Sequence, residues 1–365
     1  MPHCFLYFFN TCPIPLLLRH KGMPRNFCGA FFARIYNVRS PAQVCLIFAI
    51  QFTVMTETRR MHDVPRTFLK HFSSATTKAN NLEYTIFSAP ASNPAEALIR
   101  SMNIRNVCLE NDLYTLPGTI PEERMFLENM YNELYERKYE DLYNLLTDEK
   151  QEQLSPTQRH DIISLVVSMF FRNRSWGNTY NKLMDETYAK VFALTEDGGK
   201  ESFFMDDKEI SIAGKTLEEF QRESRKQDRP MMALTGAQKI FELVRIREVN
   251  DIVTIVKLED TPLEFIVGDN PVTLQDSVQQ RPIPFDPANT LSIPIDSKHL
   301  LQLRPWANQH QLEKDKIWRT DACGVIALAT SLINNRYQAA QPTRFILGTE
   351  PGLKTFIQTK DRYNN

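Results

Sequence analysis

The sequence predicts an α+β protein in which a predominantly helical layer packs on a small, mostly antiparallel sheet. Between residues 121 and 247 apolar residues recur at spacings of three and four, as amphipathic helices require. From Asp251 onward the chain changes to short β-branched runs separated by turn residues, which is typical of strands. With 42% hydrophobic and 24% charged residues among 365, the composition is that of an ordinary globular protein.

Residues 1–54 differ in composition from the rest of the chain. They contain five Lys or Arg residues, no Asp or Glu, and four of the six cysteines. The apolar run at 44–54 is too short for a membrane helix, and two prolines interrupt the run at 13–18 that a signal peptide would need. An organellar transit peptide fits the lack of acidic residues but not the single serine, Ser40.

A third explanation, which we favour, is that translation starts at Met55. The change in composition falls beside Met55, and the Thr-Glu-Thr-Arg-Arg that follows is an ordinary beginning for a cytoplasmic protein. On this view residues 1–54 are a non-native or disordered extension, residues 55–350 form a single α+β domain, and residues 351–365 are a polar tail.

The first helix is expected in the block that runs from Met61 to Phe72, Met-His-Asp-Val-Pro-Arg-Thr-Phe-Leu-Lys-His-Phe. Pro65 suits a helix N-terminus, because its fixed φ is already helical. The apolar residues of the block fall on one helical stripe, namely Val64, Phe68, Leu69 and Phe72. The block should therefore be a short docking helix, followed by short strands at 84–87 and 105–109.

Four helical patterns follow in the central part. The first, at 121–146, is long and amphipathic. The second begins at Ser155-Pro156, a good N-cap followed by proline at the first helical position. The last two, at 178–193 and 231–247, bracket a highly charged stretch at 215–229 that is expected to be a solvated helix or a linker.

The last third should supply the sheet. Strands are expected at 252–256, 263–267, 291–295 and 300–303. A late buried helix at 322–334 and a final edge strand at 344–347 complete the expected domain.

Charge balance and missing motifs exclude several common functions. Lys and Arg (43) nearly equal Asp and Glu (44), so no global field attracts nucleic acid, and no apolar run is long enough to span a membrane. There is no Walker loop, dinucleotide-binding glycine motif, serine nucleophile elbow or His-Glu-x-x-His helix. Cys108 and Cys323 lie in apolar contexts outside any zinc spacing, as expected for reduced, buried thiols of a cytoplasmic protein.

His62 is the first candidate for catalysis, because a histidine just before a helix N-terminus can act as a general base or a ligand. The alternative is structural, with the imidazole pinning the chain by a hydrogen bond. His71 lies nine positions later, on the opposite face of any shared helix, so the two cannot chelate one metal through that helix.

Asp269 and Asn270 form the second candidate, at the end of the apolar run Phe265-Ile266-Val267. A carboxylate at a strand end suits a catalytic role or the binding of a divalent metal. The sequence gives no indication of any other cofactor. However, Gly268-Asp269-Asn270-Pro271 also fits an Asx turn, in which Asp and Asn bond their own backbone and proline stops the ladder. Both interpretations stay open.

Two weaker candidates are polar residues at other element ends. Glu110 follows the strand expected at 105–109, a position that is usually only a solvated loop. Arg172 and Arg174 could clamp a phosphate or carboxylate, but basic residues at a helix C-terminus more often stabilise the helix dipole.

Two segments resemble the domain-of-unknown-function 4238 family. Its members open with a His-aromatic-Val-Pro-x-x-aromatic-Leu-x-x-Phe block, here residues 62–72, and later carry a strand that ends in Ser/Gly-Asp-x-Pro, here residues 265–272. Residues 293–298 and 334–339 are similar too, so the likeness extends over roughly residues 60–348. It highlights His62, Pro65, Asp269 and Pro271 and implies a cytosolic protein without an assigned activity.

The chain departs from this pattern at two positions. Asp63 stands where an aromatic residue is usual, and Gly268 stands where serine is common. A negative charge beside His62 would either raise the pKa of the imidazole or change the local packing.

The sequence leaves two functional hypotheses, with partners unknown in both. In the first, His62 and Asp269 converge in one cleft, with Asn270, Glu110 or Arg172, for acid–base or metal-assisted hydrolysis of a phosphorylated substrate. In the second, the chain is a non-catalytic binding or interaction protein whose motifs fix turns. Catalytic partners must come within hydrogen-bond reach, directly or through one water or metal, so the position of His62 relative to Asp269 discriminates between the two.

Overall fold

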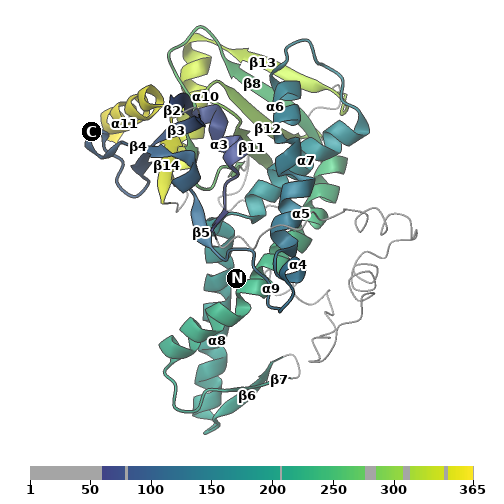
Figure 1. Ribbon diagram of the computed structural model, residues 1–365, viewed down its shortest axis with the longest axis vertical. Coiled ribbons are helices and arrows are strands. Elements are labelled where there is room, and N and C mark those ends of the chain that lie inside the picture. The colour runs from purple at the N-terminus through teal and green to yellow at the C-terminus, as the bar shows by residue number, and fades with distance from the viewer. Residues whose placement is uncertain are drawn as a thin grey trace. The chain divides into compact units, whose positions relative to one another are not determined.

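The computed structural model describes residues 60–78, 81–205, 208–275, 285–306, 313–340 and 344–364 (Figure 1). The expectations for residues 1–54 lie outside this part. The chain divides into two compact units: the larger spans 54–186 and 222–365, and the smaller includes 187–221.

One five-stranded sheet of the larger unit is antiparallel and carries the strand of the Gly268-Asp269 motif. Its order is β2-β3-β14-β9, with β4 paired to β3. The strands are β2 (Ser74–Lys78), β3 (Asn81–Pro90), β4 (Arg100–Asn103), β9 (Val267–Gly268) and β14 (Phe345–Gly348). Because Ile346 pairs with Gly268, the motif lies beside the residues that follow Arg344.

The other five-stranded sheet follows the order β10-β11-β12-β8-β13. Its strands are β8 (Asp251–Leu258), β10 (Thr273–Gln275), β11 (Thr290–Pro294), β12 (His299–Pro305) and β13 (Ile317–Ala322). All pairs are antiparallel except β8 with β13, which is parallel. A separate two-stranded pair joins β1 (Arg60–His62) to β5 (Leu109–Asn111).

Helices cover these sheets. Those of the larger unit alone are α3 (Arg66–Leu69), α4 (Pro121–Arg124), α5 (Phe126–Leu134), α6 (Tyr139–Thr147), α7 (Pro156–Phe171), α10 (Gly324–Ala340) and α11 (Glu350–Asn364). The buried residues of α7, such as Ile163 and Val166, share one apolar core with Leu301 and Val253 of the second sheet. The mixed class and the antiparallel pairing are confirmed, but the expected single small sheet is in fact several sheets.

Several predicted helices have different bounds. The pattern at 121–146 is not one helix, because the backbone leaves helical geometry at Met125 (ψ 8°) and Tyr135 (φ −127°). The Ser155 N-cap is confirmed: its hydroxyl accepts from the Gln158 backbone, and the Gln158 side chain accepts in return from the Ser155 backbone. The charged stretch at 215–229 is helical, since α9 (Leu217–Asn250) runs through it.

Two strand predictions and the tail also differ. Residues 104–106 form a 3₁₀ turn, so β5 begins only at Leu109. The expected strand at 263–267 is shortened to β9, because Asn335 of α10 bonds the Glu264 carbonyl and the Ile266 N–H, and the Phe265 N–H donates to the Ser297 carbonyl. The segment expected as a polar tail forms α11, which contacts β3 and β14 and buries Leu353, Phe356 and Ile357 (Figure 1).

The smaller unit is built around one aromatic side chain. It combines the end of α8 (Arg174–Asp197), the hairpin of β6 (Ser202–Met205) and β7 (Lys208–Ser211), and the start of α9. Phe220 contacts the rings of Tyr188, Phe192 and Phe203. In the described part of the chain, no helix has the length and apolar character needed to cross a membrane.

Candidate functional site

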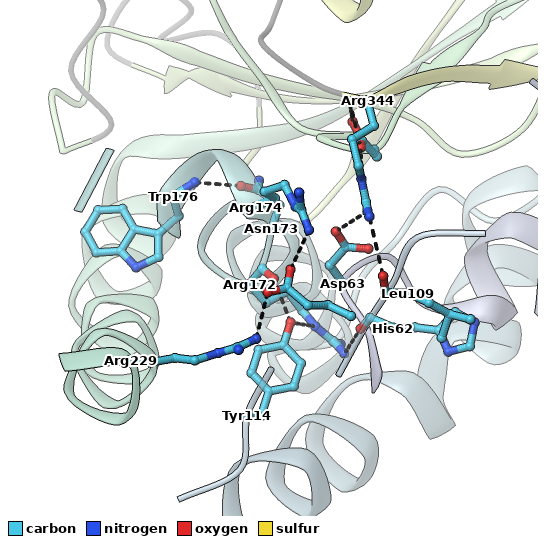
Figure 2. A network of polar contacts seen from close by, with 12 residues as sticks. His62, Asp63, Leu109, Tyr114, Arg172, Asn173, Arg174, Trp176, Arg229 and Arg344 are labelled. Carbon is cyan, nitrogen blue, oxygen red and sulfur yellow. Dashed lines mark hydrogen bonds and ion pairs between the residues drawn. The ribbon is translucent and has the colours of Figure 1, made fainter. Parts of the chain in front are cut away.

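The block 61–72 forms the predicted short helix, and its neighbouring residues His62 and Asp63 point in different directions. Phe68, Leu69 and Phe72 are buried on one face of α3 and the 3₁₀ turn that follows it, and Pro65 precedes the helix. Figure 2 shows the ring of His62 directed away from the carboxylate of Asp63. Consecutive residues of an extended segment point to opposite sides, so the block reaches two separate polar clusters.

The first cluster is a buried ion pair, which we call the Arg344 bridge (Asp63, Asp269 and Arg344). The Arg344 guanidinium donates to Asp63 Oδ2 at 2.9 Å and to Asp269 Oδ2 at 3.0 Å. Its backbone N–H donates to both oxygens of Asp269, at 3.1 and 2.9 Å. Asp63 and Asp269 are each 1% exposed, so one arginine ties the opening block to the strand that ends at Gly268.

Burial dominates the electrostatics of the bridge. It raises the pKa of Asp63 from 3.8 to about 6, against the stabilising charge of Arg344, while the nearby Asp269 raises it further. The thiol of Cys108 also lies here, fully buried, and its pKa is raised for the same reason. Its burial agrees with the sequence prediction, whereas Cys323 is exposed.

Asn270 and Pro271 are held by hydrogen bonds from helices. Asn173 donates its amide to Asn270 Oδ1, and Gln338 of α10 donates to the Pro271 carbonyl at 2.7 Å. The same Gln338 accepts from the Gly268 N–H at 2.8 Å. A Cβ at Gly268 would lie 3.0 Å from the backbone oxygen of Gln338, so a larger residue here would require this part of α10 to move by a few tenths of an ångström. The side chains of Asp269 and Asn270 thus bond distant residues, Arg344 and Asn173, and not the backbone of their own turn as an Asx turn would require.

Glu110 is engaged by two arginines rather than left in a solvated loop. Arg174 donates to Glu110 Oε2 at 2.9 Å and Arg229 to Oε1 at 2.7 Å. Arg229 also donates to the Asn111 carbonyl at 3.0 Å. Both carboxylate oxygens therefore bind a guanidinium, and the group joins β5 to α8 and α9 (Figure 2).

The second cluster surrounds Arg172, whose side chain is 1% exposed. It donates to Glu136 Oε1 at 2.7 Å and to the His62 carbonyl at 3.4 Å. The Tyr114 hydroxyl donates to the Arg172 carbonyl at 2.6 Å, and the guanidinium lies 4.6 Å from the ring centre of Tyr131. Burial lowers the pKa of Arg172, but Glu136 and Tyr114 more than compensate, so the net direction is upward.

A basic hollow of about 340 Å³ lies beside this Arg172 cluster. Its polar lining is Arg66, Thr67, Lys70, Asn103, Arg105, Asn132, Glu136 and Arg137, and its apolar lining is Leu82, Tyr84 and Ile104. Four cations thus face one carboxylate, Glu136, which already binds Arg172. The volume suits a small molecule rather than a macromolecule.

Two of the four cations have carboxylate partners nearby. Lys70 pairs with Glu140 at 3.2 Å, and Arg137 pairs with Glu133 at 2.6 Å. Among the described residues, Arg66 and Arg105 have no ion-pair partner, and both are exposed. The hollow therefore presents two arginines with unused donors.

His62 lies against the wall of this hollow. Its imidazole has a hydrogen bond to the backbone of Ile104 and an electrostatic interaction with Arg66, both wall residues. Burial, followed by Arg66, lowers the pKa of His62 from 6.5 to about 4, so the ring is neutral at pH 7. The rise in pKa that Asp63 suggested from the sequence is not found, because the two side chains point apart.

Four buried polar atoms in this region lack a hydrogen-bond partner within the described structure. They are His62 Nε2, Thr67 Oγ1, Glu128 Oε2 and Arg172 Nη1. Glu128 interacts electrostatically with Arg172, Glu136 and Arg66, and burial raises its pKa from 4.5 to about 7. Buried polar groups in folded proteins are almost always paired, so such a concentration points to a water or ligand site.

The structure thus places the residues that the sequence singled out in separate groups. Asp269, Asn270, Pro271 and Gly268 hold the turn, and Asp269 reaches Asp63 through Arg344. Arg172 donates to the His62 carbonyl, and each of the two contacts a residue that lines the basic hollow, Glu136 for Arg172 and Ile104 for His62, whereas no hydrogen bond or ion pair in the described part joins His62 to Asp269. No group of three or more His, Cys, Asp or Glu side chains in that part is arranged to hold a metal ion.

Sequence reasoning missed Arg66, Arg105 and Glu128. Arg66 lies inside the recognised block, at its one exposed helical position, which is a usable signal. Arg105 and Glu128 come from a 3₁₀ turn and from α5, and only the fold brings Arg105 to the hollow and Glu128 close to Arg172 and Arg66.

Comparison with curated proteins and with solved structures gave no match. The profile of one protein family matches residues 60–351, which include the block, the Arg344 bridge and the basic hollow. By this match the chain belongs to the family described as "Protein of unknown function (DUF4238)".

Proposed function

We propose that the chain binds a small phosphorylated molecule in the basic hollow beside His62. The observation that carries the proposal is the excess of cations in a cavity of small-molecule size, with Arg66 and Arg105 lacking ion-pair partners among the described residues. Guanidinium groups match phosphate oxygens in bidentate geometry and bind them with charge-assisted hydrogen bonds. Tyr84 and Leu82 supply an apolar wall for the organic part of the ligand.

Unpaired buried groups behind the wall support the same conclusion. Arg172 Nη1 and Thr67 Oγ1 are donors without an acceptor in the described structure. A buried donor left unpaired costs about 1–3 kcal/mol, and an anion in the hollow that accepts from Thr67, one of its lining residues, would remove part of that cost. Glu136 keeps Arg172 in place through its 2.7 Å ion pair and limits how many phosphate charges the hollow accommodates.

Calorimetric titration with pyrophosphate tests the proposal. Arg66→Ala and Arg105→Ala should each weaken binding about tenfold, the equivalent of one charge-assisted hydrogen bond. Affinity should also fall as sodium chloride rises, because both arginines are exposed. Arg336→Ala is the matched control, since Arg336 is exposed on α10 and does not line the hollow. Equal affinity in all four proteins, or no binding by the wild type, would refute the proposal.

Hydrolysis of the bound phosphate ester is the second candidate. It is favoured by the neutral imidazole of His62, whose Nε2 is buried and has no partner in the described residues. A neutral ring can accept a proton from an attacking water. Hydrolysis assisted by a divalent metal belongs to the same candidate, whereas a non-catalytic binding protein needs the hollow but not the proton acceptor.

A His62→Gln variant separates the two. Turnover of generic phosphomonoesters and phosphodiesters would be measured with and without magnesium or manganese, alongside pyrophosphate affinity. Lost turnover with retained affinity assigns His62 to the chemistry. If the wild type binds pyrophosphate but turns over no substrate of the panel, the binding role alone stands. Asp269→Asn is measured beside it as a variant of the Arg344 bridge, for which a loss of stability is expected.

A further inference from the structure

Glu128 lies close to the basic hollow and has no part in the binding proposed above. Its Oε2 is buried and lacks a hydrogen-bond partner among the described residues. An ionised carboxylate left in this way is unfavourable, whereas the protonated form loses less solvation. Burial accordingly raises the pKa of Glu128 from 4.5 to about 7. The group is therefore partly protonated at neutral pH.

Three charged side chains from three other elements act on Glu128. They are Arg66 of α3, Glu136 of the 3₁₀ turn Glu136–Lys138, and Arg172 at the end of α7. Arg66 and Glu136 line the hollow, so Glu128 is within electrostatic reach of an anion bound there. On α5 itself, Glu128 acts on the phenol of Tyr131, which is neutral at pH 7 because its pKa is raised to about 12.

The charge of Glu128 decides whether this cluster attracts an anion. Arg66 and Arg172 bring two positive charges, and Glu136 brings one negative charge. With Glu128 ionised the cluster is neutral, and with Glu128 protonated it carries one net positive charge. Arg105 adds a positive charge in both states, and the other two cations of the hollow have carboxylate partners. A bound anion therefore favours the protonated form of Glu128.

Other groups with shifted pKa values do not supply this effect near neutral pH. His62 interacts with the same two arginines, but its pKa is lowered to about 4, so the ring stays neutral. Asp63 titrates near pH 6 and Asp251 near pH 7. The charged groups that act on these two carboxyls do not line the hollow. Glu128 is thus the group whose proton an anion in the hollow controls.

We propose that the hollow binds its anion together with one proton, which Glu128 takes up from the solvent at its carboxylate. Such coupling rests on the proposed function, since the anion is the one held by Arg66 and Arg105. The only bond formed is the O–H bond of the carboxyl group, and the ligand itself is unchanged. The affinity of the hollow for an anion is therefore highest at acidic pH and falls as Glu128 ionises.

Calorimetric titration of the wild type and Glu128→Gln with pyrophosphate at about pH 6, 7 and 8.5 tests this coupling. Glutamine has the shape of the protonated carboxyl group and cannot ionise. Pyrophosphate titrates in this range too, but identically with both proteins, so the ratio of the two Kd values isolates Glu128. If the bound anion raises the pKa of Glu128 by about one pH unit, the Kd of the wild type relative to the variant should rise roughly fivefold to tenfold from the lowest to the highest pH.

Titrations in two buffers with different ionisation enthalpies, Tris and HEPES, count the protons directly. At about pH 7.5 the wild type should take up about half a proton more than Glu128→Gln. Glu122→Gln is the matched control, because Glu122 is an exposed carboxylate of α4 that does not line the hollow, and it should behave as the wild type does. A second variant that cannot ionise, Glu128→Met, guards against a local defect at the amide, and circular dichroism checks the fold of all variants.

Each remaining outcome counts against the coupling. A Kd ratio that stays constant with pH, or equal proton uptake by the wild type and both Glu128 variants, overturns it and leaves the proposed function standing. Loss of the pH dependence in Glu122→Gln as well would show that total charge, and not Glu128, is responsible. A wild type that binds no pyrophosphate at any pH refutes the proposed function itself, and the coupling with it.

Discussion

Replacing Asp63 with asparagine should flatten the dependence of stability on pH. The folded pKa of Asp63 is about 6, above its ordinary value of 3.8, because burial outweighs the attraction of Arg344. A carboxyl group with a raised folded pKa contributes stability below pH 3.8 that is lost as pH rises through 6. The difference of about two pH units corresponds to ~3 kcal/mol. Asparagine keeps an acceptor for Arg344 and does not titrate.

Other groups titrate in the same pH range, but their contributions to the free energy of unfolding are the same in Asp63→Asn and in the wild type. Glu128 and Asp251, with pKa values raised to about 7 by burial, change stability in the same direction as Asp63. His62, with its pKa lowered to about 4, acts oppositely, because its unfolded form binds the proton more readily. All three are present in both proteins. The difference between variant and wild type therefore isolates Asp63.

The assay is urea unfolding of both proteins at about pH 4.5, 5.5, 6.5 and 7.5. The free energy of unfolding of Asp63→Asn relative to wild type should rise by ~2 kcal/mol from the lowest to the highest pH, because about a third of the full effect lies below pH 4.5. Asp269, Glu110 and Arg174 also act on this carboxyl and set the midpoint of the change. A difference that stays constant across the range would show that burial does not control the titration of Asp63, and would refute the reasoning.

Three further substitutions test the packing around the two clusters. Gly268→Ala should destabilise the protein by about 1–3 kcal/mol, because the new Cβ meets a backbone oxygen, whereas Gly348→Ala, whose Cβ would lie 3.5 Å from a side-chain carbon, should cost less in the same urea assay. Gln338→Leu should cost about 1–3 kcal/mol by leaving two backbone groups unpaired, measured as a lower urea midpoint with an unchanged slope. Arg172→Met should cost about 3–5 kcal/mol by leaving the Glu136 carboxylate without its 2.7 Å partner, and a thermal shift as small as that of Arg336→Ala would contradict this.

The sequence predicted those parts of the fold that depend on local pattern. The stripe of Phe68, Leu69 and Phe72 and the cap at Ser155 are decided within a few residues, so periodicity and capping rules predict them. The strand expected at 263–267 failed for a non-local reason. Two of its backbone groups bond the side chain of Asn335, about seventy residues away, and no local rule predicts such a partner.

The candidate site shows the same division. His62 was recognised because it opens a distinctive local pattern and Asp269 because it follows an apolar run, but their pairing could not be tested without the fold. Asp63 was recognised only as a departure from the family pattern. Its partner Arg344 lies 281 residues away, in a segment where the sequence predicts only an edge strand. A contact between residues so far apart in the chain cannot be predicted from one sequence.

Asp63 and His62 together suggest how the fold and the proposed function are connected. Adjacent in the chain and opposite in direction, they divide the block between a structural cluster and the hollow. Arg344 fixes the backbone of the block through Asp63, and this fixes the position from which His62 reaches Ile104 and the wall of the hollow. Weakening the bridge should therefore disturb ligand binding at a distance, by moving His62 and not by removing a group that touches the ligand. If Asp269→Asn lowered stability but left pyrophosphate affinity unchanged, the two clusters would be energetically independent, and the hollow alone would carry the function.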